Sequence, residues 1–125
     1  MATARIVSAS TNPNPIGRLR RPGLSVEPLE LERETVLVLR GEFDITGLDA
    51  FRDAVAQVSP THSMVVDLRE LTFLDSSGLG ALIVLHERAR SEGWSLVVSG
   101  PQPPVEMVLR ISGLSQRLTI VENTG

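Results

Sequence analysis

The chain has 125 residues, enough for one domain with a substantial core, and an ordinary globular composition of 42% hydrophobic and 22% charged residues. It contains no cysteine, which excludes disulfides, thiolate metal sites and cysteine nucleophiles. Two histidines and no tyrosine leave few groups for acid–base chemistry near neutral pH. We therefore expect no enzyme, no metal site and no bound cofactor.

The charge is divided unevenly along the chain. The four arginines before Glu27 give that segment a charge of +4, and the remainder carries −7. An acidic body argues against direct DNA binding, which needs clustered cations on a folded surface. The basic segment could touch an acidic partner or nucleic acid, although a solvated flexible end is the simpler interpretation.

No segment of the chain has the pattern of a signal peptide or of a membrane span. The first 23 residues contain no early apolar run, and no later segment reaches the roughly 18 consecutive apolar residues that a spanning helix requires. We expect a cytoplasmic protein without a membrane partner.

A polar tail followed by two strands is predicted for the N-terminal part. Residues 1–23 are rich in Ser, Thr, Asn, Pro and Gly, which predicts a disordered basic tail and places the domain at 24–125. The runs 24–31 and 35–40 predict a hairpin, with Pro28 indicating an edge or bulged first strand. The second run is apolar on both faces, which predicts an inner strand covered on each side.

Two helices and a strand are predicted next. Thr46 has the character of a helix N-cap, and Pro60 ends that helix. The run 64–68 predicts a buried strand that leads through a short loop into a long helix over 76–92, with Gly93 as its C-terminal stop.

The C-terminal part completes an α/β fold. A strand at 96–98, a helix opened by Pro103 and Pro104, and a last strand at 118–121 follow in order. The alternation predicts a single domain with a mixed, mostly parallel sheet of about five strands, an opening antiparallel hairpin and three main helices.

One segment stands out as a candidate functional site. Asp-Ser-Ser-Gly-Leu-Gly at 75–80 opens the long helix with small or polar residues. The first N–H groups of a helix have no intrahelical acceptor, so this tip is suited to an anion. In the simplest interpretation, Asp75 or Ser76 only caps the helix.

Two features favour more than a cap. The helix is apolar nearly all round for two turns after the serines, and a single sheet can bury only one stripe of it. Another part of the domain or a partner must bury the rest. Gly78 and Gly80 also leave the backbone near the serines open to close approach, although glycine weakens a helix by up to about 1 kcal/mol.

The motif at 75–80 resembles that of the STAS domain of bacterial anti-sigma-factor antagonists. Two further segments share the resemblance, namely Gly-Glu-Phe-Asp at 41–44 and the stretch 104–118 with its Gly-Leu turn. The resemblance covers roughly residues 24–122 and leaves the tail unexplained. Phe43 stands where the family commonly has Leu, and the Thr46-Gly47 pair is an unusual start to the next helix.

The resemblance implies a partner switch that regulates transcription. By resemblance Ser77, or less favoured Ser76, is phosphorylated by a partner that is both an anti-sigma factor and a serine kinase. The unphosphorylated form would bind that partner and free the sigma factor, and a PP2C-type phosphatase would reset the switch.

The implied partner-binding face contains seven residues. They are Asp44, Thr46, Asp75, Ser76, Ser77, Gly78 and Leu79. For Asp44 and Thr46, helix capping is an equally good explanation.

Two other classes of function are alternatives to this switch. A serine hydrolase would need a base and an orienting group, and the chain lacks the nucleophile-elbow, P-loop and dinucleotide motifs. A STAS-type module that binds a ligand or serves as a scaffold in a sensory complex remains open, because one fold hosts several roles.

Overall fold

The computed structural model describes residues 5–6, 23–60 and 62–122 and contains one six-stranded sheet. The strands follow the spatial order β1-β2-β3-β4-β5-β6, antiparallel from β1 to β3 and parallel from β3 to β6. Their bounds are β1 Arg5–Ile6, β2 Leu24–Glu30, β3 Glu34–Phe43, β4 Ser63–Leu74, β5 Ser95–Ser99 and β6 Thr119–Val121.

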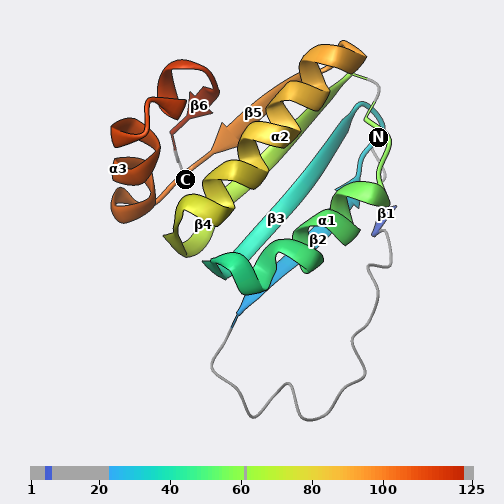
Figure 1. Ribbon diagram of the computed structural model, residues 1–125. Coiled ribbons are helices and arrows are strands. Elements are labelled where there is room, and N and C mark those ends of the chain that lie inside the picture. Colours follow the sequence, from blue (N-terminus) through green and yellow to red (C-terminus); the bar gives the residue numbers. More distant parts are fainter. Residues whose placement is uncertain (1–4, 7–22, 61, 123–125) are drawn as a thin grey trace, which may run out of the picture.

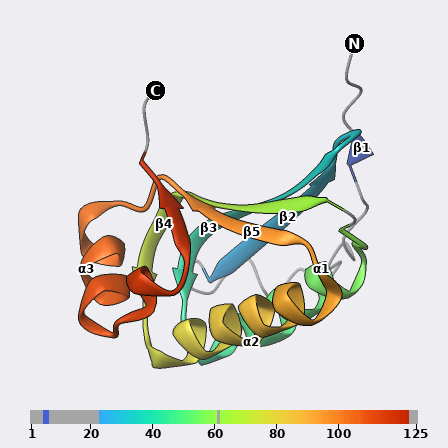
Figure 2. The same ribbon diagram turned by 90° about the horizontal axis from the view of Figure 1, so that it is seen from above.

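Three α-helices connect the parallel strands. They are α1 Leu48–Ala56, α2 Ser76–Glu92 and α3 Pro103–Ile111, and short 3₁₀ turns lie at Ile45–Gly47 and Leu114–Gln116. Helices α1 and α2 lie side by side on one face of the sheet, and α3 lies at the opposite end of the molecule from β1 (Figures 1 and 2). The predicted α/β class, opening hairpin and parallel order are confirmed.

The N-terminal segment contributes one short strand to the sheet. Arg5 pairs with Glu30 and Ile6 with Leu29, at the β2 edge. Residues 1–4 and 7–22 of the predicted tail lie outside the described residues.

Two boundary predictions were wrong. The strand expected to end near residue 68 continues to Leu74, so β4 runs directly to the start of α2 without a loop. Its partner β3 extends to Phe43, and two register shifts, at Val38/Arg40 and Gly41/Glu42, let the paired strands continue. Long strands therefore bring residues 43 and 74 to the same end of the sheet.

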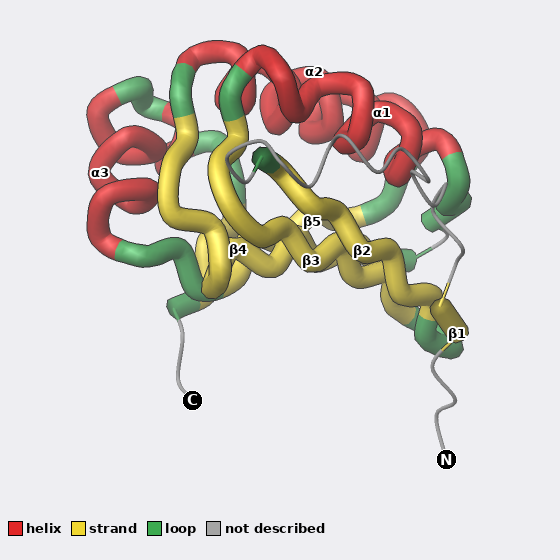
Figure 3. The backbone as a smooth tube through the Cα atoms, turned by 90° about the horizontal axis from the view of Figure 1, so that it is seen from below, coloured by secondary structure: helices red, strands yellow, loops and turns green. Residues whose placement is uncertain are grey.

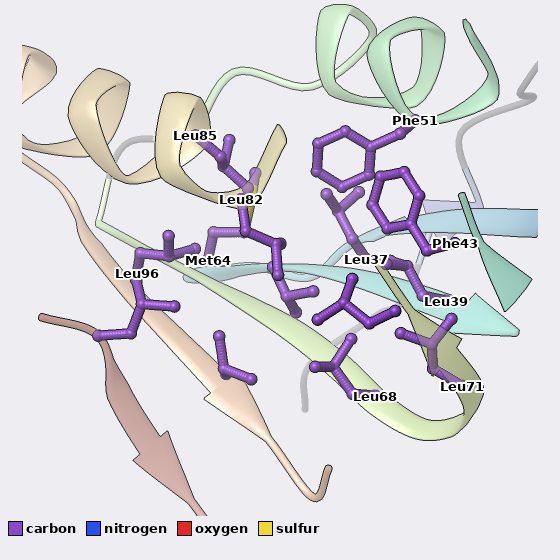
Figure 4. Packing of buried hydrophobic residues seen from close by; sticks show 14 of the residues in the cluster. Leu37, Leu39, Phe43, Phe51, Met64, Leu68, Leu71, Leu82, Leu85 and Leu96 are labelled. Carbon is purple, nitrogen blue, oxygen red and sulfur yellow. The ribbon is translucent and has the colours of Figure 1, made fainter. Parts of the chain in front are cut away.

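The hydrophobic core lies between the sheet and the helices α1 and α2. Leu37, Leu39 and Met64 point from the two central strands toward the helices (Figure 4), and these three residues and Val66 are fully buried. The ring of Phe43, at the end of β3, lies 5.0 Å from the ring of Phe51 in α1. This aromatic pair fixes the first turns of α1 over the end of β3.

The opposite face of the sheet carries no helix in the described part of the chain (Figures 2 and 3), so the prediction of a strand covered on both sides was wrong. Val38 is nevertheless buried, because Glu27 and Asp67 flank it in register. Arg40 Nη1 lies 2.9 Å from Glu27 Oε1, and Arg69 Nη2 lies 2.8 Å from Asp67 Oδ2. Ion pairs thus shield the apolar residues of this face.

No helix in the described ranges is both long enough and apolar enough to cross a membrane.

We predict that the Asp67–Arg69 pair makes stability fall at acid pH. Burial alone would raise the pKa of Asp67, but hydrogen bonds and charge from Arg69 hold it below its ordinary value of 3.8. Because the pKa of Asp67 is lower in the folded than in the unfolded state, its ionised carboxylate stabilises the fold above the ordinary pKa. This stabilisation is lost as the pH falls through the lowered pKa. Asp67→Asn should lower the free energy of unfolding at neutral pH by about 1 kcal/mol and flatten its decline at acid pH.

Urea titrations followed by the fluorescence of Trp94, the chain's single tryptophan, measure this from neutral pH down to about pH 3. Parallel pH curves for the wild type and Asp67→Asn would contradict the assignment.

Candidate functional site

The tip of α2 is capped by Asp75. Its Oδ1 accepts hydrogen bonds from the N–H of Ser77 at 2.9 Å and of Gly78 at 3.2 Å, and its carbonyl accepts from Leu79 at 2.9 Å. The capping interpretation is therefore correct for Asp75, and Ser76 is the first residue of the helix. The amides of Ser77 and Gly78, which the sequence suggested were available to an anion, already bind this carboxylate.

The end of β3 is joined directly to this tip. The N–H of Asp75 donates to the carbonyl of Phe43 at 3.2 Å. The next residue is Asp44. Its Oδ1 accepts two hydrogen bonds from Thr46, one from the backbone N–H at 2.9 Å and one from the hydroxyl at 2.5 Å. Asp44 and Thr46 are thus brought to the same end of the molecule as Ser77.

The prediction that Thr46 caps the first helix was wrong. Asp44 caps a 3₁₀ turn at Ile45–Gly47, and Gly47 is the N-cap of α1. The Thr46 hydroxyl donates to the charged carboxylate of Asp44, which makes a stronger acceptor than a backbone group, instead of accepting from the first turn of α1.

Gly78 is a packing residue at this junction. A Cβ built on it would lie 2.5 Å from Leu74 Cδ1, 2.9 Å from Phe43 Cγ and 3.0 Å from the Phe43 carbonyl oxygen. Gly78 is buried, and Leu79 is partly buried and packs against the core.

Both serines lie at an open groove between α1 and α2, with a volume of about 530 Å³. Ser76 is exposed and Ser77 half-buried. The groove is lined mainly by apolar and small residues, with an arginine on each helix. Its lining consists of Leu48, Phe51, Arg52, Val55, Ala56, Ser76, Ser77, Gly80, Ala81, Val84, Leu85 and Arg88.

The far end of the groove is held by Arg88. Its guanidinium donates to the carbonyls of Val55 and Val58 and to Glu92, and it lies 5.7 Å from the centre of the Trp94 ring. The Trp94 ring N–H donates to Glu92 Oε1 at 2.9 Å, and this bond, together with Arg88, holds the pKa of Glu92 below its ordinary value. Arg88 is therefore a fixed part of the scaffold.

The comparisons with known proteins agree with this geometry. The family model described as "Mlab, STAS domain" matches residues 29–122, three quarters of the chain. The chain belongs to the STAS-domain family. It is 37% identical over 89 residues to a STAS-domain-containing protein of Pseudomonas aeruginosa (strain UCBPP-PA14), covering 70% of this chain and 88% of that protein.

Two further similarities involve anti-sigma factor antagonists. An anti-sigma F factor antagonist of Paenibacillus polymyxa is 33% identical over 101 residues, which cover 76% of this chain and 86% of that protein. The crystal structure of an anti-sigma factor antagonist from Mycobacterium paratuberculosis has the same fold, with a TM-score of 0.69, 24% identity, and coverage of 82% of this chain and 88% of that one.

The groove of this STAS domain is lined by apolar residues, small residues, two serines and two arginines. Neither histidine and no carboxylate is among the residues that line it. Groups of acidic or histidine side chains able to hold a metal ion are absent from the described residues. A half-open apolar groove with hydroxyls at one end suits a protein surface or a small apolar molecule.

Sequence reasoning found the serine tip and missed the groove. The residues of α1 that line it, above all Leu48 and Arg52, have ordinary helical spacing. The available signal was the excess of apolar residues on α2: Leu82 and Leu85 are buried, whereas Val84 is 69% exposed and lies in the groove. The expectation that the sheet alone could not cover this helix is correct.

We predict opposite effects of alanine at the two glycines of this STAS motif. Gly78→Ala should lower the free energy of unfolding by about 1–3 kcal/mol, because the added methyl group overpacks the junction with Phe43 and Leu74. Gly80→Ala should raise it by up to about 1 kcal/mol, because a Cβ there meets no atom within 4 Å and alanine favours the helix.

Urea unfolding of both variants beside the wild type provides the measurement. Equal effects at positions 78 and 80 would contradict the packing role of Gly78.

Proposed function

We propose that this STAS domain is a cytoplasmic anti-sigma-factor antagonist regulated by phosphorylation of Ser77. The unphosphorylated form binds an anti-sigma factor that is also a serine kinase and releases the sigma factor. Phosphorylation abolishes this binding, and a PP2C-type phosphatase restores it. The similarity to the Paenibacillus polymyxa anti-sigma F factor antagonist supports the proposal.

The observation that carries the proposal is the position of Ser77 at the end of an apolar groove. Ser77 lines the groove together with Leu48, Phe51 and Val84. A partner that fills the groove would take only a neutral hydroxyl out of water, and one hydrogen bond to the partner compensates for that loss. A phosphate at the same atom adds about −1.5 to −2 charges, and burying it against a partner without a cation costs several kcal/mol.

The neighbouring acids strengthen this argument. Asp75 stands two residues before Ser77, and Asp44 lies at the same end of the molecule. A partner surface that fits these carboxylates already carries complementary groups for them. Additional negative charge would have no complementary group on that surface and would weaken binding. The core is not involved, because Ser77 lies outside the buried cluster.

We predict that Ser77 takes one phosphate and that this phosphate releases the partner. A candidate anti-sigma kinase from the same genome, with ATP, should add one phosphate to the peptide containing Ser77 in the wild type and in Ser76→Ala, and none in Ser77→Ala. The phosphorylated form should bind the kinase at least about 100-fold more weakly, since each 1.4 kcal/mol is about tenfold.

Mass spectrometry locates the phosphate, and calorimetry measures the affinity. A phosphate on Ser76 would move the switch by one residue, whereas undiminished binding of the phosphorylated form would refute the switch. Tight binding without phosphate transfer would favour the scaffold alternative.

We also predict that the partner contacts the groove. Val84→Glu, on the exposed wall of the groove, should weaken partner binding by about tenfold or more. Met107→Glu is the matched control, because Met107 is 57% exposed on α3, outside the groove, and its variant should bind like the wild type. Calorimetry with the unphosphorylated proteins separates the two, and equal losses would place the contact elsewhere.

A further inference from the structure

A phosphate on Ser77 would need a counter-charge that the helix tip does not offer. The N–H groups of Ser77 and Gly78 already donate to Asp75 Oδ1, and that of Leu79 donates to the Asp75 carbonyl. The phosphate would therefore stand beside the capping carboxylate instead of receiving these amides. Two adjacent anions repel each other unless a cation lies within reach.

Arg52 is the cation best placed to provide that charge. It lines the groove on α1, and Ser77 lines the same groove on α2. Its chain neighbour Phe51 contacts the ring of Phe43, and the same Phe43 ring lies directly against Gly78. The first turns of the two helices therefore face each other. Arg52 begins the next turn of α1 and lines the same groove as the serines from the other helix.

Arg52 is also available for a new partner. Its side chain is exposed and makes no ion pair within the described ranges, although the acids Asp49 and Asp53 are close to it in sequence. The other arginine of the groove, Arg88, is engaged at the far end with Glu92 and the carbonyls of Val55 and Val58.

We propose that Arg52 is the intramolecular counter-ion of phosphorylated Ser77 and that the pair closes the serine end of the groove. This inference rests on the proposed phosphorylation of Ser77. A guanidinium binds phosphate oxygens through two parallel N–H bonds, so the flexible Arg52 side chain would be fixed across the groove. The phosphate would then block docking in two ways, by the negative charge that one guanidinium leaves uncompensated and by drawing Arg52 over the apolar lining.

The test uses the full chain with phosphoserine installed at position 77 during translation, so no kinase is needed. Phosphorus NMR follows the second ionisation of the phosphate with pH in the wild type, Arg52→Gln, Arg52→Lys and Arg90→Gln. The midpoint should lie about one pH unit higher in Arg52→Gln than in the wild type, because an adjacent cation favours the dianion. Arg52→Lys should recover most of the difference.

Arg90→Gln is the matched control, since Arg90 is exposed in the last turn of α2 and its loss changes net charge equally. Its midpoint should follow the wild type. The proposal is overturned if Arg52→Gln and the wild type titrate together, or if Arg90→Gln shifts the midpoint as much. Circular dichroism and Trp94 fluorescence verify that each variant is folded.

The result separates this inference from the proposed function. If the phosphorylated wild type loses its partner but Arg52→Gln does not alter the titration, the switch holds and the role of Arg52 is refuted. If the titration shifts but the phosphorylated chain binds its partner undiminished, Arg52 does hold the phosphate and the proposed function fails.

Discussion

The hydrogen bond from the Asp75 N–H to the Phe43 carbonyl ties the start of α2 to the end of β3, and the site depends on this junction. Helix and strand approach so closely that only glycine fits at position 78. Because Asp75 is held by the strand, its carboxylate is in place to cap the next turn. Gly78 faces Phe43 and Leu74 at this junction, and its neighbour Ser77 is half-buried and lines the groove.

The one-sided sheet explains why a groove opens beside the serines. Both α1 and α2 must bury their apolar stripes on the same face, so they lie side by side (Figure 1). Small residues at Ala56, Gly80 and Ala81 leave the space between them unfilled. On the opposite face, carboxylate–arginine pairs such as Arg40–Glu27 shield the valines. The exposed side chain of Val84 lies in the groove beside the serines, whereas Met107 and Ile111 are exposed on α3.

The sequence predicted the helices, the strands and the serine tip because each is marked by a few neighbouring residues. Apolar runs mark the strands, and capping residues and Gly93 mark the helix ends. The cap after β3 was predicted wrongly because Asp44 and Thr46 are both good capping residues, and the Thr46 N–H and hydroxyl donate to Asp44. The continuation of β4 was not predicted because the charged, exposed residues Arg69 and Glu70 interrupt its apolar pattern. The groove depends on how two helices pack, so Arg52 carried no signal in the sequence.

The range of electrostatic forces limits how such a switch can act. The described charges are spread over the molecule, and at physiological salt an exposed charge is screened beyond about 8 Å. Additional negative charge at Ser77 would therefore be felt mainly by the nearest groups, Asp75, the Asp44 turn and the arginine across the groove. The net acidity of the domain contributes little. A rigid junction with a few charged groups at its surface is sufficient for a large change in affinity, because the fold need not move.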